Sequence, residues 1–352
     1  MKIAIDCRVK GNSGIKTFLE GILPHLKASD NEILLIGSIG SGEGERCEVK
    51  PFSLRELFCF PKDVLCKINL CDVYFTPYCN VPSGIKIPVF SVIHDVIFLD
   101  MKLSGKIGTL ARKFFYKRAV RISRTVFTVS NFSKERIQTH LGHGTRVRVV
   151  YNGVPHYVEE AEDHARGVQK DGSIVFVGSI KKHKGLSLLL DAFEKLLQDT
   201  GAKRKLLIVG AGENFRTKDG SVLAQIDTIN AKFPSAVEFT GFVENDRLVM
   251  LLAKAHVLVQ PSLYEGFGIP PLEAMSLGTK ALLSDIPALK EIYEGFPVVF
   301  FRSGDADDLC EKLKAVLADD TPLGVLPQKY SYLKTANAIL DEFATALRGL
   351  TD

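Results

Sequence analysis

Residues 261–278 read P-S-L-Y-E-G-F-G-I-P-P-L-E-A-M-S-L-G, and the interpretation of the whole chain starts from them. The apolar run 255–259 before them predicts a buried strand, and the glycines predict a bend. Pro270 and Pro271 then open a pattern of apolar residues with helical spacing that ends at Gly278. The order strand, loop and helix is typical of a parallel α/β sheet.

Two carboxylates lie eight residues apart in this stretch, Glu265 in the loop and Glu273 in the first helical turn. Gly266 and Gly268 allow the backbone to approach a ligand, and the helix start favours an anion such as a phosphate. Because a carboxylate repels phosphate, we expect both glutamates to accept hydrogen bonds from sugar or ribose hydroxyls. The alternative is an exposed loop carboxylate at 265 and a favourable helix-start charge at 273. The spacing alone leaves both interpretations open.

The segment E-G-F-G-I-P-P-L-E-A-M-S-L-G resembles, nearly residue for residue, the E-x7-E signature of the retaining glycosyltransferases of family 4. The resemblance implies the GT-B fold and a nucleotide-diphosphate sugar as donor, with no metal ion and no further cofactor. It also implies that Glu265 binds hydroxyls of the donor sugar and that Glu273 binds the ribose. The backbone between the two glutamates is then expected to contact the donor at Gly266, Phe267, Gly268 and Ile269.

Length and composition predict two globular domains. A chain of 352 residues exceeds what one hydrophobic core usually supports, and its 46% of hydrophobic residues is ordinary. No apolar run approaches the roughly 18–20 residues that span a bilayer. The start M-K-I-A-I-D predicts a first strand and not a signal peptide. Seven cysteines without a C-x-x-C pair favour reduced thiols in a cytoplasmic protein over disulfides or a zinc site.

Charge is distributed unevenly along the chain. Residues 1–155 hold 23 basic and 13 acidic residues, a net charge of +10, whereas the remainder has a net charge of −6. This predicts that the first half meets an anionic partner, either a membrane surface, a lipid phosphate or a nucleic acid. No nucleic-acid-binding motif occurs, so we do not expect nucleic acid.

Residues 102–124 concentrate this positive charge in a basic amphipathic helix. The segment has no acidic residue, and its basic residues alternate with Leu110, Phe114, Phe115 and Val120. Such a helix is typical of peripheral contact with an anionic membrane. The alternative is a solvated helix whose aromatic residues pack into the domain. Both hold together if Phe114 packs inward while the arginines face lipid head groups. The basic residues of the segment are Lys102, Lys106, Arg112, Lys113, Lys117, Arg118, Arg121 and Arg124.

Two positions of the first half resemble donor or acceptor sites of the family. A strand at 1–7, a glycine loop and a helix at 17–26 predict a Rossmann-like unit. The family's loop lies against the donor diphosphate, and Gly14 matches it, although Ser13 stands beside it where a second glycine is usual. A plain strand-to-helix turn is the alternative. The strand 88–94 ends in His94-Asp95, and the family places this histidine beside the reacting sugar and the acceptor. The alternative is a structural histidine.

In the second half, a strand at 173–180 is followed by K-K-H-K-G-L. The family has an arginine and a lysine five residues apart here, both on the donor phosphates. Lys184 matches the lysine, but Ser179 stands at the arginine position, so that Lys181, Lys182 or His183 would have to replace it.

Two further patterns lie in the second half. The segment V-E-F-T-G-F-V at 237–243 resembles the part of the family that holds the nucleobase through its backbone, which predicts a contact at Val243. The sequence D-A-D at 305–307 resembles a metal-binding D-x-D, but its place just before a helix predicts capping.

Together these features predict an α/β protein of the GT-B class, with two Rossmann-like, doubly wound parallel-sheet domains and an interdomain cleft. We expect an acceptor-binding domain at 1–168, a nucleotide-sugar domain at 172–322 and a helix at 328–352 that crosses back onto the first domain. The expected function is a retaining, metal-independent hexosyltransferase. It would act on a glycan or lipid-linked acceptor in bacterial surface-polysaccharide or lipopolysaccharide assembly, in the cytoplasm at the inner face of the membrane. The alternatives are a catalytically silent nucleotide-sugar-binding or scaffold protein and a sugar-nucleotide epimerase, which the E-x7-E pattern disfavours.

Overall fold

The structure is a computed structural model that describes residues 1–9, 14–37, 44–101, 103, 105–165, 167–210 and 220–349. The chain forms two compact units, residues 1–153 with 330–352, and residues 154–329. The boundary between residues 153 and 154 lies before the predicted domain limits of 168 and 172, because the short helices α7 (His156–Glu159) and α8 (Glu162–Ala165) pack on helix α11 of the second unit.

The first unit contains a six-stranded sheet in the order β2-β1-β3-β4-β5-β6, and all neighbouring strands are parallel. The strand order reverses between β1 and β3, where the carboxyl ends of a doubly wound sheet usually hold ligands. The strands are β1 Lys2–Asp6, β2 Glu32–Ile36, β3 Val73–Thr76, β4 Val89–Val92, β5 Ser123–Thr128 and β6 Val147–Val149.

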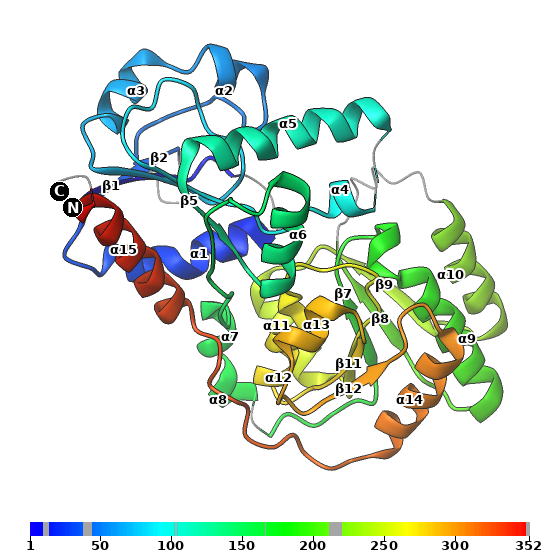
Figure 1. Cartoon of the computed structure of the whole chain (residues 1–352). Coiled ribbons are helices and arrows are strands. Elements are labelled where there is room, and N and C mark those ends of the chain that lie inside the picture. Colours follow the sequence, from blue (N-terminus) through cyan, green and yellow to red (C-terminus); the bar gives the residue numbers. More distant parts are fainter. Residues whose placement is uncertain are drawn as a thin grey trace. The chain divides into compact units, whose positions relative to one another are not determined.

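Helices cover both faces of this sheet. Right-handed crossovers place α1 on one face and α2, α3, α5 and α6 on the other. The terminal helix α15 packs on α1, and Figure 1 shows these two helices on the side of the sheet opposite to α2, α3 and α5. The helices are α1 Gly14–Lys27, α2 Leu54–Phe58, α3 Lys62–Ile68, α4 Ile97–Asp100, α5 Lys106–Ile122, α6 Asn131–Leu141 and α15 Tyr332–Arg348.

The face of helix α5 that is exposed to solvent differs from the face that the sequence predicted. Tyr116 and Ala119 are buried against the unit, whereas Phe114, expected to pack inward, is 56% exposed. Two of the arginines expected to face lipid instead contact the protein. The Arg112 guanidinium lies 3.5 Å from the centre of the Phe98 ring, and Arg118 donates to the backbone and side chain of the loop before β4. The inward prediction for Phe114 is wrong because Phe114 lies on the helix face opposite to Tyr116 and Ala119. Lys102 and the side chain of Lys106 lie outside the described part of the chain.

The second unit contains a six-stranded parallel sheet in the order β12-β11-β10-β7-β8-β9. Its order reverses between β7 and β10. Two doubly wound parallel sheets confirm the predicted architecture. The strands are β7 Ile174–Val177, β8 Leu206–Val209, β9 Val237–Gly241, β10 Val257–Gln260, β11 Lys280–Ser284 and β12 Val298–Phe301.

Both faces of the second sheet are buried. Successive residues of β7 pack in opposite directions, with Phe176 in the core beside α9 and Val175 in the core beside α11. Asp305 caps α14 by accepting a 2.9 Å hydrogen bond from Asp308 N–H, which confirms the capping prediction. One face carries the helices α9 Leu186–Thr200, α10 Gly220–Lys232 and α14 Ala306–Ala318, and the other carries α11 Asn245–Lys254, α12 Ile269–Ser276 and α13 Pro287–Ile292.

Candidate active site

The loops after β7 and β10 meet at the carboxyl edge of the second sheet, where the strand order reverses. β7 and β10 are parallel neighbours, so their following loops leave the sheet at the same edge. A backbone hydrogen bond of 2.8 Å from Leu263 N–H to the His183 carbonyl joins these loops. Gly185 has φ +70°, and a Cβ there would lie 1.9 Å from the Pro261 carbonyl oxygen. This close approach requires glycine.

Lys184 and Glu265 form an ion pair across these two loops. The Lys184 ammonium donates to both carboxylate oxygens of Glu265, at 2.7 and 2.9 Å. The Lys184 side chain is 23% exposed and the Glu265 side chain 9%. The structure therefore brings together two of the residues that the sequence analysis assigned separately to phosphate and sugar. The burial of Glu265 excludes the alternative of an exposed loop carboxylate.

Two more side chains hold the Glu265 carboxylate. Gln260 Nε2 and Ser262 Oγ each donate to Oε1 at 2.7 Å. Burial alone would raise the pKa of Glu265, but the Lys184 charge and these hydrogen bonds outweigh it and hold the pKa below its usual range. Glu265 is therefore ionised at neutral pH. The buried Gln260 Oε1 has no hydrogen-bond partner among the described residues. Gln260 and Ser262 were not predicted from the sequence, although polar residues at the end of an apolar strand can indicate a site.

The start of α12 has fewer free backbone N–H groups than a helix start usually offers to an anion. Gly268 precedes the helix with φ +81°, and its carbonyl accepts a hydrogen bond from the Tyr293 hydroxyl. Pro270 and Pro271 have no N–H, so only Ile269 offers a backbone donor among the first three helical residues. An anion here would rely on the helix dipole, the loop amides and Lys184.

Gly266 and Phe267 link this helix start to Glu265, and both are buried. Phe267 is 3% exposed, so its ring packs into the unit.

Glu273 lies just past the first turn of α12, since the helix begins at Ile269. It is 5% exposed, and its Oε1 accepts a hydrogen bond from the Tyr157 hydroxyl of α7. Burial raises the pKa of Glu273 to about 7, although the bond from Tyr157 lowers it. Glu273 therefore changes charge near neutral pH. Tyr157 was missed because its pairing with Glu273 depends on how α7 packs against α12.

The neighbouring loops after β7, β8 and β9 also approach one another at this edge. A Cβ on Gly210 would lie 1.9 Å from the Gly178 carbonyl oxygen, and Gly210 N–H donates to the Gly241 carbonyl at 3.0 Å. Ser179 follows Gly178 in a turn and is partly exposed, and Val243 follows β9 and packs against the core beside α11.

The residues proposed to replace the missing arginine differ in charge. Burial and the neighbouring Lys184 lower the pKa of His183 to about 4, so His183 is neutral at neutral pH. Lys181 and Lys182 are exposed cations on the same turn. Of the three candidates, only these two lysines supply the charge that Ser179 lacks.

His94 and Gly14 belong to the first unit. His94 Nε2 lies 3.0 Å from the Pro77 carbonyl, and the Phe18 ring packs edge-on at 5.2 Å between ring centres. Burial lowers the pKa of His94 to about 4. Because a carbonyl only accepts, Nε2 carries the proton and Nδ1 keeps a lone pair. Gly14 begins α1, and a Cβ there would meet no atom within 4 Å; residues 10–13 before it lie outside the described residues.

A buried polar cluster occupies the point of order reversal in the first sheet, and the sequence analysis did not find it. Arg8 donates to Asp6 and Glu56 at 2.5 Å and to the Tyr78 hydroxyl at 2.9 Å. Tyr74 and Tyr78 each donate to Asp6 at 2.7 Å. The cluster fixes α2, which carries Glu56, to the end of β1. Two polar residues, Asp6 at the end of the buried strand β1 and Arg8 just after it, were the available signal.

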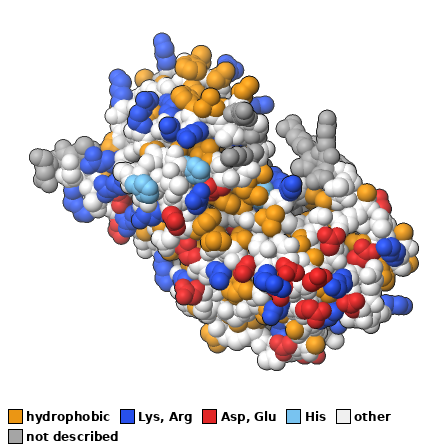
Figure 2. All heavy atoms as spheres, turned by 45° about the vertical axis from the view of Figure 1, so that its right-hand side comes forward, with side chains coloured by type: hydrophobic (Ala, Val, Ile, Leu, Met, Phe, Trp, Pro, Cys, Tyr) orange, Lys and Arg blue, Asp and Glu red, His pale blue; other side chains and the backbone are white. Residues whose placement is uncertain are grey.

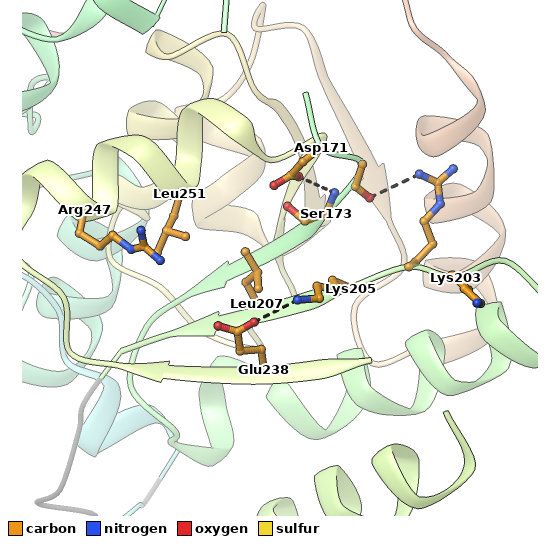
Figure 3. Close-up of a pocket in the computed structure, with 10 residues that line it drawn as sticks. Asp171, Ser173, Lys203, Lys205, Leu207, Glu238, Arg247 and Leu251 are labelled. Carbon is orange, nitrogen blue, oxygen red and sulfur yellow. Dashed lines mark hydrogen bonds and ion pairs between the residues drawn. The ribbon is translucent and has the colours of Figure 1, made fainter. Parts of the chain in front are cut away.

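A hollow of about 290 Å³ lies at the opposite edge of the second sheet (Figure 3). It lies beside the segments that precede β7 and β8, and the ion pair of Lys205 with Glu238 lines it at 3.4 Å. Parallel sheets hold ligands at the carboxyl ends of their strands, so this hollow is separate from the candidate site.

A group of possible metal ligands lies on α9 and α14. The donor atoms of Asp199, Cys310 and Glu311 lie within 4.8 Å of one another. The Lys314 ammonium binds Asp199 at 2.8 Å and Glu311 at 2.7 Å. The Lys314 ammonium thus already binds both carboxylates of this group.

Comparison with known families covers both halves of the chain. Residues 158–334 match the family described as glycosyl transferases group 1, and residues 72–156 match Glycosyltransferase Family 4. The chain is 36% identical over 178 residues to an uncharacterized glycosyltransferase of Methanocaldococcus jannaschii, which covers 47% of this chain and 44% of that protein. It is 31% identical over 181 residues to an O-antigen chain mannosyltransferase of Salmonella typhimurium, covering 51% of this chain and 47% of that protein. The chain thus spans less than half the length of both relatives.

Solved structures match over nearly the full chain. The Anabaena protein HepE in complex with UDP and glucose has a TM-score of 0.74 at 17% identity, covering 98% of this chain and 99% of that one. A lipopolysaccharide outer core galactosyltransferase has a TM-score of 0.64 at 19% identity, covering 97% and 100%. At these identities the likeness shows a shared fold.

Proposed function

Since this chain belongs to family 4 of the glycosyltransferases, the group 1 glycosyl transferases with the GT-B fold, we propose that it is a retaining, metal-independent hexosyltransferase. Its donor would be a nucleotide-diphosphate sugar and its acceptor a hydroxyl of a glycan or glycolipid. The observation that carries the proposal is the Lys184–Glu265 pair at the order reversal of the second sheet. A cation and an ionised carboxylate held together suit a ligand that has phosphates next to hydroxyls.

In the proposed reaction, the bond between the anomeric carbon and the diphosphate oxygen breaks, and both electrons leave on the diphosphate. Lys184 uses two of its three N–H groups on Glu265, and the third would donate to a phosphate oxygen. Together with the positive end of α12, it would stabilise the departing charge. Glu265 would orient the sugar through its hydroxyls, and Glu273 would accept from the ribose.

The acceptor oxygen would form its bond to the anomeric carbon on the face from which the diphosphate leaves. Its proton would pass to a leaving phosphate oxygen, so that no covalent enzyme intermediate is needed. In this proposal His94 serves the acceptor side through its neutral imidazole: Nε2 is held by the Pro77 carbonyl, and Nδ1 would accept a hydrogen bond from the acceptor hydroxyl.

The names of the relatives guide the choice of substrate. O-antigen chain and serotype-specific mannosyltransferases occur among them, so a mannosyl donor and surface-polysaccharide or lipopolysaccharide assembly are the first candidates. We place the reaction in the cytoplasm at the inner face of the membrane. All seven cysteines are free thiols, as expected for a reducing compartment.

A thermal-shift screen of the purified chain against UDP-, GDP- and dTDP-sugars tests the donor, followed by assays of sugar transfer and donor hydrolysis. We expect one nucleotide class to raise the unfolding temperature and its sugar to be released. A catalytically silent binding protein remains the second candidate, because Ser179 replaces the expected arginine. Stabilisation by a nucleotide sugar without any transfer or hydrolysis would favour this candidate, and no stabilisation by any of the three would contradict both.

A further inference from the structure

Exposed large apolar side chains are concentrated in one part of the first unit. Of the 14 large apolar side chains that are well exposed in the described part of the chain, eight lie between residues 52 and 114. Seven of them are more than half exposed, and the six with exposures of 56% or more define what we call the outer apolar patch: Leu54 70%, Phe58 78%, Leu70 77%, Ile107 87%, Leu110 70% and Phe114 56%. Large apolar surfaces of this kind mark an interaction site.

The elements that carry the patch belong to one layer of the fold. The crossovers from β2 to β3 and from β4 to β5 run in the same direction along the sheet, so right-handedness places α2, α3 and α5 on the same face. In Figure 2 the part of the first unit that these helices form, at the top of the view, carries orange side chains with blue ones around them.

The exposed face of helix α5 carries both apolar and basic residues. Its exposed stripe follows the helical repeat through Ile107, Leu110, Phe114, Lys117 and Arg121, so that the apolar half of the helix leads into a basic half. No acidic residue occurs between positions 101 and 134. A surface with this composition attracts an anionic, apolar partner.

We propose that the outer apolar patch docks the first unit onto an anionic membrane surface. Ile107, Leu110 and Phe114 enter the boundary of the acyl chains, and Lys117 and Arg121 lie among the phosphate head groups. None of the described helices is both long and apolar enough to cross a bilayer, so the contact is interfacial. A second copy of this chain fits the patch less well, because a symmetric interface brings uncompensated basic residues together. This inference does not depend on the proposed catalytic activity.

The test is flotation of the full chain with vesicles of pure phosphatidylcholine and with vesicles that also contain phosphatidylglycerol. We expect binding to the anionic vesicles that weakens as salt is raised. The triple variant Ile107→Ser, Leu110→Ser, Phe114→Ser should bind at least about ten-fold more weakly, since it loses buried apolar area.

The matched control replaces exposed apolar residues elsewhere, with Leu223→Ser, Met250→Ser and Leu333→Ser, and should bind as the wild type does. A second variant, Lys117→Glu with Arg121→Glu, should lose the preference for anionic vesicles while keeping its apolar patch. Thermal unfolding shows that each variant is folded.

Three outcomes would overturn the proposal. The first is a wild-type chain that does not float with anionic vesicles. The second is a triple variant that binds as tightly as its matched control. The third is a wild-type chain that self-associates through the patch on gel filtration and binds no vesicle, because the surface would then serve a second copy.

Discussion

Replacing Lys184 with methionine removes the cation from the candidate site and keeps the length of the side chain. The variant leaves Glu265, whose side chain is 9% exposed, without its ion-pair partner. If the pair both holds the loops and stabilises a departing diphosphate, stability and catalysis fall together. Lys290→Met is the control, because Lys290 is an exposed lysine on α13 in the same unit.

The magnitude follows from the environment of the pair. Removing one partner of a buried ion pair costs about 3–5 kcal/mol of unfolding free energy. Here Lys184 is 23% exposed, and Gln260 and Ser262 still donate to the carboxylate. We therefore expect a loss of about 2 kcal/mol at neutral pH, which is below the range for a fully buried pair.

The loss depends on pH with a defined sign. In the wild type the folded pKa of Glu265 lies below the ordinary 4.5, so its stabilising contribution is present above 4.5 and disappears as the pH falls through the folded pKa. In the variant, burial raises the pKa of Glu265, and the ionised form destabilises the fold. The difference between the two proteins is thus greatest at neutral pH and shrinks below 4.5.

Urea unfolding at neutral and acidic pH measures the stability, and initial rates of sugar transfer measure the catalysis. A loss of about 2 kcal/mol leaves most molecules folded, because domains typically have 5–15 kcal/mol of stability. A fall of about 100-fold to 1,000-fold in kcat/KM would then report the lost stabilisation of the leaving group. A variant with the unfolding midpoint and transfer rate of the Lys290→Met control would refute both roles of the pair.

Three further predictions concern single side chains. Tyr157→Phe removes the hydroxyl that donates to Glu273, so the pKa of Glu273 should rise above about 7. The pH profile of donor-nucleotide binding, measured by calorimetry, should then shift to higher pH, and an unshifted profile would contradict this pairing. Gly185→Ala places a Cβ 1.9 Å from a carbonyl oxygen and should lower the free energy of unfolding, measured in urea, by more than about 1 kcal/mol. Gly14→Ala is the control, because a Cβ there meets no atom within 4 Å, and it should change this free energy by less than about 0.5 kcal/mol. Equal effects of the two glycine variants would argue against the close approach. His94 has an ordinary pKa of 6.5 and a folded pKa of about 4, so between these pH values the unfolded chain binds one more proton than the folded chain. The free energy of unfolding of the wild type should therefore fall by up to about 1.4 kcal/mol per pH unit as the pH is lowered through this range. His94→Gln should remove that part of the slope in urea titrations, and a variant with the wild-type slope would show that His94 is not its source.

The regular elements of the second unit were largely predictable because its strands are continuous apolar runs and its helices repeat with an apolar stripe. The capping role of Asp305 and the final helix from Tyr332 followed from local patterns of the same kind. No clear helical or strand pattern can be recognised in the sequence of residues 47–68, because α2 and α3 are short, at 5 and 7 residues. A helix of one or two turns displays too few residues for a period to be recognised.

The candidate site was predictable as two separate stretches, but its internal contacts were not. Lys184 and Glu265 are 81 residues apart, and nothing in either stretch indicates that the two side chains meet. The partners Gln260 and Tyr157, and the Asp6–Arg8 cluster of the first unit, were likewise missed. In each case the contact joins side chains of different elements, or it depends on how a loop turns.

The sequence by itself determined the class of the fold, the family and the loops that carry the candidate site, because these depend on local periodicity and on a long motif. Only the tertiary structure decided which side chains share a hydrogen bond and which face of α5 is exposed. The physical reason is that β7 and β10 become neighbours through a crossover of the chain, and burial between neighbouring elements then sets the charge state of groups such as Glu265, Glu273 and His94.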